Sequence, residues 1–122
     1  MVKTVKITTE SRISVVELPN WNWKAQAKEI GAEYIEIVRT KRMYDLFGEK
    51  VVMIVDDSGL VENKQENPYA SYLYGADQHG EIIAGDVLLG VQKGLDVFPL
   101  ENPEKTLKVL ALEFPILQRI LG

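Results

Sequence analysis

The side chains with the most chemical capability gather between residues 67 and 87, where an aromatic group, the single histidine and a glycine–aspartate pair follow one another: Tyr69, Tyr72, Tyr74, His79, Gly85 and Asp86. Exposed tyrosine rings could form a stacking wall for a base or another planar ligand. Glycine would let the backbone approach such a ligand closely, and an aspartate could accept its hydrogen bonds. The alternative is that the rings pack a short helix onto a sheet, with their hydroxyls reaching water. Composition alone does not separate the two interpretations.

A catalytic site could also be built from this stretch. His79 could form an acid–base pair with Asp77 or Asp86, and Ser71 could act as a nucleophile. However, Gln78-His79-Gly80 has the composition of a loop tip, where a single histidine is usually exposed or caps a turn. We therefore predict no catalytic residue and treat His79 as a candidate ligand contact. A small hydrolase using His79 is kept as the third of three hypotheses.

A second candidate contact is a basic patch of three cations within four residues, Arg39, Lys41 and Arg42. Guanidinium and ammonium groups bind phosphates and other anions, so the patch could contact an anionic ligand. The alternative is a solvated strand end. The formal net charge of −4 argues against duplex nucleic acid as the main partner, because that binding depends on neutralising many phosphates.

Several established ligand motifs are missing from the sequence. The glycines form neither a phosphate loop ending in Gly-Lys-Ser/Thr nor a dinucleotide-binding Gly-x-Gly-x-x-Gly. One histidine and no cysteine cannot supply a nitrogen- and sulfur-based metal site. The segment 56–59 is a turn without the ligand spacing of a calcium loop. We predict no metal and no cofactor.

Length and composition indicate a single globular domain over residues 1–122. The chain is 46% hydrophobic and 26% charged, which is typical of a domain that buries its own core. The absence of cysteine suits a reducing compartment. No apolar run approaches the roughly 18 residues of a membrane span, and polar residues are interleaved at the N-terminus. We expect no signal peptide, no membrane partner and a cytoplasmic location.

Hydrophobic periodicity predicts the strands. Residues 3–9 and 12–18 alternate apolar and polar side chains and should form a hairpin. Residues 34–39 form a third strand, and the continuous apolar run 51–55 a strand buried on both faces. Residues 85–91 form the fifth, followed by a short extended piece at residues 96–100. The conformation of residues 40–50 is left open between a helical turn and a hairpin arm.

The first predicted helix covers Trp21–Ile30, with Asn20 as its N-cap and Gly31 as its end. Its buried stripe should contain Trp23, together with the alanine and isoleucine that follow at helical spacing. Trp21 lies off this stripe, and we expect partial burial against a neighbouring loop.

Two more helices begin with an asparagine cap followed by proline. Asn67 and Pro68 should start a helix of about two turns that ends at Gly75. The C-terminal helix should start the same way and carry one apolar face, with Pro115 kinking or splitting it. That face is formed by Leu107, Leu110, Ala111, Phe114, Leu117 and Leu121. The elements together predict an α+β domain with a mixed or antiparallel sheet of about five strands, two or three short helices and a longer C-terminal helix.

Four segments carry a family resemblance: Gly31 to Val38, the apolar strand ending in Asp56 to Leu60, Asn67 to Gly75, and Ile83 to Val87. Together they resemble the family catalogued as domain of unknown function 3846, over about residues 12–91. The most specific parts are the Asn-Pro-x-Ala helix start and the Gly-Asp-Val strand entry. Members of that family occur mostly in phages, plasmids and other mobile elements.

The resemblance implies a biological setting and no particular chemistry. The leading hypothesis is a non-enzymatic binding protein of phage or mobile-element origin, an anti-defence protein that sequesters a cyclic nucleotide signal as a homo-oligomer. The alternative is a protein-interaction module that inhibits a host protein through the Tyr69 to Tyr74 surface or the C-terminal helix.

Overall fold

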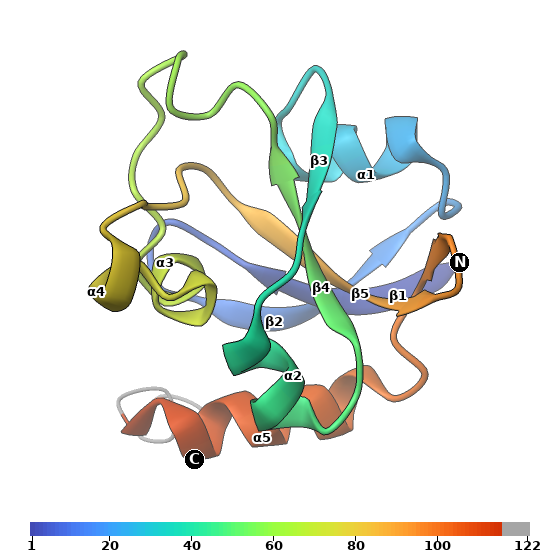
Figure 1. Ribbon diagram of the computed structural model, residues 1–122. Coiled ribbons are helices and arrows are strands. Elements are labelled where there is room, and N and C mark those ends of the chain that lie inside the picture. The colour runs from blue at the N-terminus through green and yellow to red at the C-terminus, as the bar shows by residue number, and fades with distance from the viewer. Residues whose placement is uncertain (116–122) are drawn as a thin grey trace.

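The computed structural model describes residues 1–115, apart from the side chains of Asp77 and His79 (Figure 1). The predicted apolar face of the C-terminal helix extends to Leu117 and Leu121, which lie outside the described residues. Within the described part, the chain forms one α+β domain, as the sequence predicts.

A single antiparallel sheet organises the domain, and its strands are β1 (Val2–Ile7), β2 (Ile13–Leu18), β3 (Ile35–Val38), β4 (Val51–Asp56), β5 (Val87–Lys93) and β6 (Asp96–Phe98). The strand order is β2-β1-β5-β4-β3, and β6 pairs with the far end of β5. The predicted hairpin is present, with Val2 opposite Leu18 and Ile7 opposite Ile13. The sheet has one strand more than expected, because the extended piece after the Gly94 turn pairs back onto β5.

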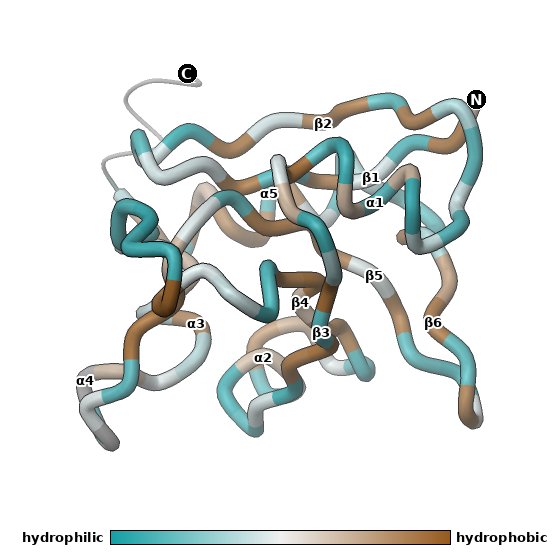
Figure 2. The backbone as a smooth tube through the Cα atoms, turned by 90° about the horizontal axis from the view of Figure 1, so that it is seen from above, coloured by the Kyte–Doolittle hydropathy of each residue, from teal (hydrophilic) through white to brown (hydrophobic). Residues whose placement is uncertain are grey.

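The helices are α1 (Trp23–Ile30), α2 (Lys41–Phe47), α3 (Pro68–Tyr74), α4 (Ala76–His79) and α5 (Pro103–Glu113). Helix α1 lies on one side of the sheet, while α2, α3 and α5 lie on the other (Figure 1). Seen from above, α4 and β6 occupy opposite ends of the molecule (Figure 2). The 67–87 stretch and the β5–β6 turn are therefore far apart.

Strand β4 is buried along its whole length, as its continuous apolar run predicts. Its alternate side chains enter two cores. Ile54 packs with Leu88 and Ile30 beneath α1, while Met53 packs with Leu110 on the opposite face. Because successive side chains of a strand point to opposite faces, one apolar strand can anchor helices on both sides of the sheet.

Helix boundaries follow their caps, with one correction. Asn22, not Asn20, caps α1: its side chain accepts from the Ala25 amide at 2.9 Å, and Asn20 instead accepts from the Asn22 amide at 3.0 Å. Trp23 then starts the helix and is 46% exposed, so its predicted burial is wrong. Trp21 is partly buried as expected, and its indole N–H donates to the Val97 carbonyl at 3.0 Å.

The open segment 40–50 is helical. Thr40 caps α2 by accepting from the Met43 amide at 3.2 Å, and Gly48 ends the helix with a left-handed φ of 70°. At the C-terminal end, α5 stops at Glu113, because a residue that precedes a proline is driven to an extended conformation. Phe114 accordingly has φ −113° and ψ 92°, so Pro115 ends this run of helix.

Candidate ligand-binding site

The three tyrosines of α3 do not form one wall. Tyr69 packs its ring 4.4 Å from that of Phe114, and Tyr72 meets the same ring edge-on at 5.3 Å. The Tyr72 hydroxyl also donates to the Glu113 carboxylate at 2.6 Å. These two tyrosines therefore have a packing role, but they pack α3 against the end of α5 and not against the sheet, and the Tyr72 hydroxyl is bonded to Glu113.

Tyr74 lies apart from the other two tyrosines. Its hydroxyl donates to the Glu81 carboxylate at 3.1 Å. The hydrogen bond to Glu81 raises the pKa of Tyr74 above its ordinary value, with smaller contributions from burial and from the charges of Glu81 and Glu36. Tyr74 faces a hollow of about 560 Å³ whose lining includes four carboxylates: Glu36, Asp56, Asp57 and Glu81. A negatively charged ligand is disfavoured there.

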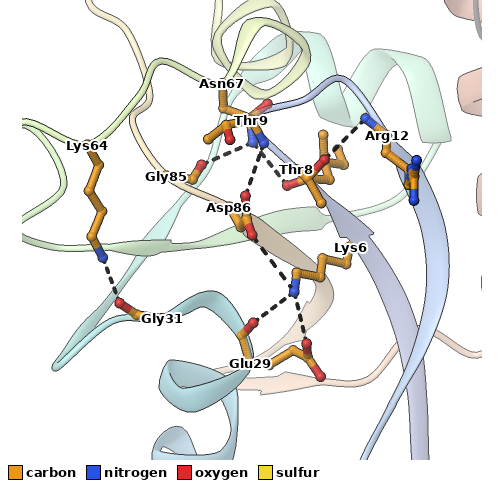
Figure 3. Close-up of polar contacts among 11 residues, drawn as sticks. Lys6, Thr8, Thr9, Arg12, Glu29, Gly31, Lys64, Asn67, Gly85 and Asp86 are labelled. Atoms are coloured by element: carbon orange, nitrogen blue, oxygen red, sulfur yellow. Dashed lines mark hydrogen bonds and ion pairs between the residues drawn. The ribbon is translucent and has the colours of Figure 1, made fainter.

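Gly85 and Asp86 hold the sheet and α3 together (Figure 3). The Gly85 carbonyl accepts from the Asn67 side-chain amide at 3.0 Å, and glycine suits this position because its φ is +89°. The Asp86 carboxylate accepts from the Thr9 amide at 3.0 Å and lies 3.8 Å from the Lys6 ammonium. Both candidate ligand contacts are thus occupied by internal partners.

The catalytic hypothesis loses its nucleophile. Ser71 is buried, and its hydroxyl donates to the Ile83 carbonyl at 3.3 Å while accepting from the Ile83 amide at 2.9 Å. That hydroxyl fixes the loop before β5 to α3 and does not face solvent. The backbone of His79 ends the short helix α4, in place of the expected loop tip, and its side chain lies outside the described part of the structure.

The basic patch divides between two surfaces. Arg42 lies in the first turn of α2 with its guanidinium 4.4 Å from the centre of the Tyr72 ring, and it donates to the Tyr72 carbonyl at 2.6 Å. It therefore braces α2 against α3. Arg39 and Lys41 instead border a hollow of about 460 Å³ between the start of α2 and the ends of β4 and β5.

This hollow, here called the Arg39 hollow, combines cations, an aromatic ring and an apolar floor, and it is lined by Arg39, Thr40, Lys41, Tyr44, Lys50, Val51, Val52 and Gln92. Its charged lining residues among those described are all cations. Arg39, Lys41 and Lys50 are exposed, and Tyr44 is 51% exposed. The Arg39 Nε–H donates to the Gln92 side-chain oxygen, which orients the guanidinium at the mouth.

Strand alternation and one helix cap position these groups. Arg39 continues the series Ile35 and Ile37, which face α1, and Val52 and Gln92 lie on the same face of their own strands. Thr40 turns the chain into α2, so Lys41 and Tyr44 fall one turn apart on a single helix face. Three strands and a helix start therefore converge on the Arg39 hollow.

Sequence reasoning identified Arg39 and Lys41 and missed Tyr44, Lys50 and Gln92. Lys50 immediately precedes β4, and its carbonyl accepts from the Gln92 amide at 2.9 Å. Only the antiparallel pairing of β4 with β5 brings these two residues together across more than forty positions of sequence. Tyr44 became assignable only once residues 41–47 were known to be helical.

Among the described side chains, which exclude those of Asp77 and His79, no three histidine, aspartate or glutamate residues are grouped so that they could hold a metal ion. Within residues 1–115, no helix combines the length and the apolar character needed to cross a bilayer.

Comparisons with known proteins inform the fold alone. No family model matches the chain, and a search of curated proteins gives no match. Among solved structures, the fold is similar to part of the crystal structure of small RNA methyltransferase HEN1, with a TM-score of 0.56 and 19% sequence identity. The similarity covers 90% of this chain and only 16% of that protein. It therefore shows a shared arrangement of helices and strands and no shared activity.

Proposed function

We propose that the protein is a non-enzymatic binding protein for a small nucleotide and that the Arg39 hollow is its ligand site. The observation that carries this proposal is the convergence of three cations, one exposed tyrosine ring and an apolar floor in a single hollow of about 460 Å³. The phage or mobile-element setting, and a cytoplasmic anti-defence role as a nucleotide sponge, rest on the family resemblance and belong to the same proposal.

The charges of the hollow favour an anion. Arg39 and Lys50 approach it from the ends of β3 and β4, and Lys41 approaches from α2, where its ammonium is shared with Asp45 at 3.0 Å. A guanidinium can bind two phosphate oxygens at once, and lysines add mobile point charges. The chain as a whole has a net charge of −4, and the hollow beside Tyr74 is lined by carboxylates. The Arg39 hollow differs from that hollow in carrying positive charge, which is why we assign the anionic ligand to it.

The remaining groups favour a ligand that also carries a planar part. The half-exposed ring of Tyr44 offers a face for stacking. The side-chain amide of Gln92 accepts from Arg39 and donates to the Gly94 carbonyl at 3.2 Å, which leaves it a second N–H and a second oxygen lone pair for a ligand. Val51 and Val52 give the hollow an apolar floor. A nucleotide matches this set of groups: its base can stack on the Tyr44 ring and hydrogen-bond to Gln92, and its phosphate can contact the cations.

Isothermal titration calorimetry against cyclic di- and trinucleotides and the isomers of cyclic ADP-ribose tests the proposal. We expect Lys50→Ala to weaken binding about tenfold, because a lost charge-assisted hydrogen bond costs about 1.5 kcal/mol or more. Lys108→Ala is the matched control, since it removes the same charge from an exposed position on α5, outside the hollow. A flat response across the panel, or equal losses for the two variants, would contradict the proposal.

A further inference from the structure

A second exposed aromatic surface lies at the other end of β3. Trp23 and Tyr34 are 46% and 55% exposed, and their rings stack with centroids 5.7 Å apart and planes inclined by 17°. Neither ring enters a core cluster of the described residues. The inner faces of stacked rings cover each other, so a base would stack on an outer ring face and continue the stack, a mode of binding that tolerates any base sequence.

Cations flank this aromatic platform, which we define as Trp23 and Tyr34. Lys24 holds its ammonium 5.8 Å from the centre of the Trp23 ring, and Lys28 follows one helical turn later on α1. Both lysines are exposed and border the same hollow of about 450 Å³. Glu33 also borders it, so the cations outnumber the carboxylate by one. Positive charge beside stacked rings is the combination that binds single-stranded nucleic acid.

The aromatic platform and the Arg39 hollow lie along one edge of the sheet. Strand β3 pairs only with β4 among the described strands, so its other edge is open. Tyr34 precedes β3 and stacks on Trp23 of α1. Arg39 follows β3 and continues the face of the strand that is turned toward α1. Five residues of extended chain span about 16 Å, and Ile35 and Ile37 supply a half-buried apolar path between the two sites.

We infer that the ligand is built from several linked nucleotides, with a phosphate in the Arg39 hollow and a base on the Trp23–Tyr34 platform. This inference rests on the proposed function and extends it from one nucleotide to a chain. A single nucleotide cannot reach both sites. A stacked strand advances about 3.4 Å per nucleotide, so about five units cover the distance, and fewer suffice when the strand is extended.

The test is calorimetry with 5′-phosphorylated oligoadenylates of one, three, five and eight units against the full chain. Affinity should rise with length up to about five units and then level off. Trp23→Ala should weaken binding of the five-unit ligand about tenfold and leave AMP binding unchanged, because base stacking on an aromatic ring contributes at that level. Phe98→Ala is the matched control, because Phe98 is also an exposed ring (44%) beside a lysine, with the Lys93 ammonium 5.8 Å from its centre. Phe98 lies on β6, outside the platform, so its loss should leave the affinity unchanged.

The outcomes separate this inference from the proposed function. No heat with any oligoadenylate, AMP included, would count against both. AMP binding without a length dependence would leave the nucleotide site standing and overturn the inference. Sedimentation velocity provides the remaining arm: if Trp23→Ala dissociates an oligomer and leaves oligoadenylate affinity intact, the platform is an interface between copies of the chain and the inference is wrong.

Discussion

Asn67 and Asn102 are a matched pair that tests whether the 67–87 stretch is a structural joint. Both cap a helix whose first residue is proline, and both accept from the amide three residues later at 3.1 Å. Asn102 is exposed, and within the described part of the chain its side chain makes that bond alone. Asn67 is fully buried, and its side-chain amide also donates to the carbonyls of Ile7 and Gly85, each at 3.0 Å.

The structure sets the size of the difference. Replacing either asparagine by alanine removes a cap that contributes about 1 kcal/mol. Asn67→Ala also leaves two buried carbonyl groups without that donor, at about 1 kcal/mol each. We therefore expect a loss in the free energy of unfolding of about 3 kcal/mol for Asn67→Ala and about 1 kcal/mol for Asn102→Ala.

Urea unfolding followed by circular dichroism measures both losses. With an m-value of roughly 1.5 kcal/mol/M, the midpoint should fall by roughly 2 M for Asn67→Ala and by roughly 0.7 M for Asn102→Ala. Equal shifts for the two variants would refute the reasoning, because the buried bonds to β1 and to the loop before β5 would then contribute nothing measurable.

Three further predictions concern groups outside the Arg39 hollow. Lys64→Met should lower the free energy of unfolding by about 3 kcal/mol, because it leaves the buried Asp56 carboxylate without its cation, and urea unfolding measures the loss. Glu81→Gln should lower the pKa of Tyr74 toward 10.0, measured by NMR of ¹³C-tyrosine. The hydrogen bond from Tyr74 to Glu81 stabilises the fold below pH 10, and its contribution is lost as the pH rises through the raised pKa of Tyr74. Gly59→Ala should reduce the thermal midpoint, measured by calorimetry, because its methyl group would lie 2.6 Å from a backbone oxygen.

Local signals predicted most of the fold. The alternation in residues 3–9 and 12–18, the apolar run of β4 and the asparagine–proline helix starts all depend on neighbours in sequence, and the structure has each of them. The spacing of Trp23 from Ala27 and Ile30 places it on the buried face of the helix, but that spacing does not show how far along the helix the core extends. Trp23 is the first residue of α1 and is 46% exposed, whereas Ala27 and Ile30 further along the helix are buried.

The candidate site could be predicted only in part, because long-range pairing decides it. Three neighbouring cations looked like one patch, yet the cap at Thr40 changes the direction of the chain between them. Arg39 therefore stays with the strand face, while Arg42 turns back onto Tyr72. The sequence also leaves the tyrosines open between ligand stacking and packing, because no local pattern indicates that Phe114 returns to pack on Tyr69 and Tyr72.

The most direct test of the central claim is the location of nucleotide binding. Amide chemical shifts of the ¹⁵N-labelled full chain should be recorded during titration with AMP. We expect shifts at Arg39, Thr40 and Gln92, around the Arg39 hollow, and little change at Gly85 and Asp86. Shifts confined to the 67–87 stretch, with the amides around the hollow unmoved, would contradict the central claim.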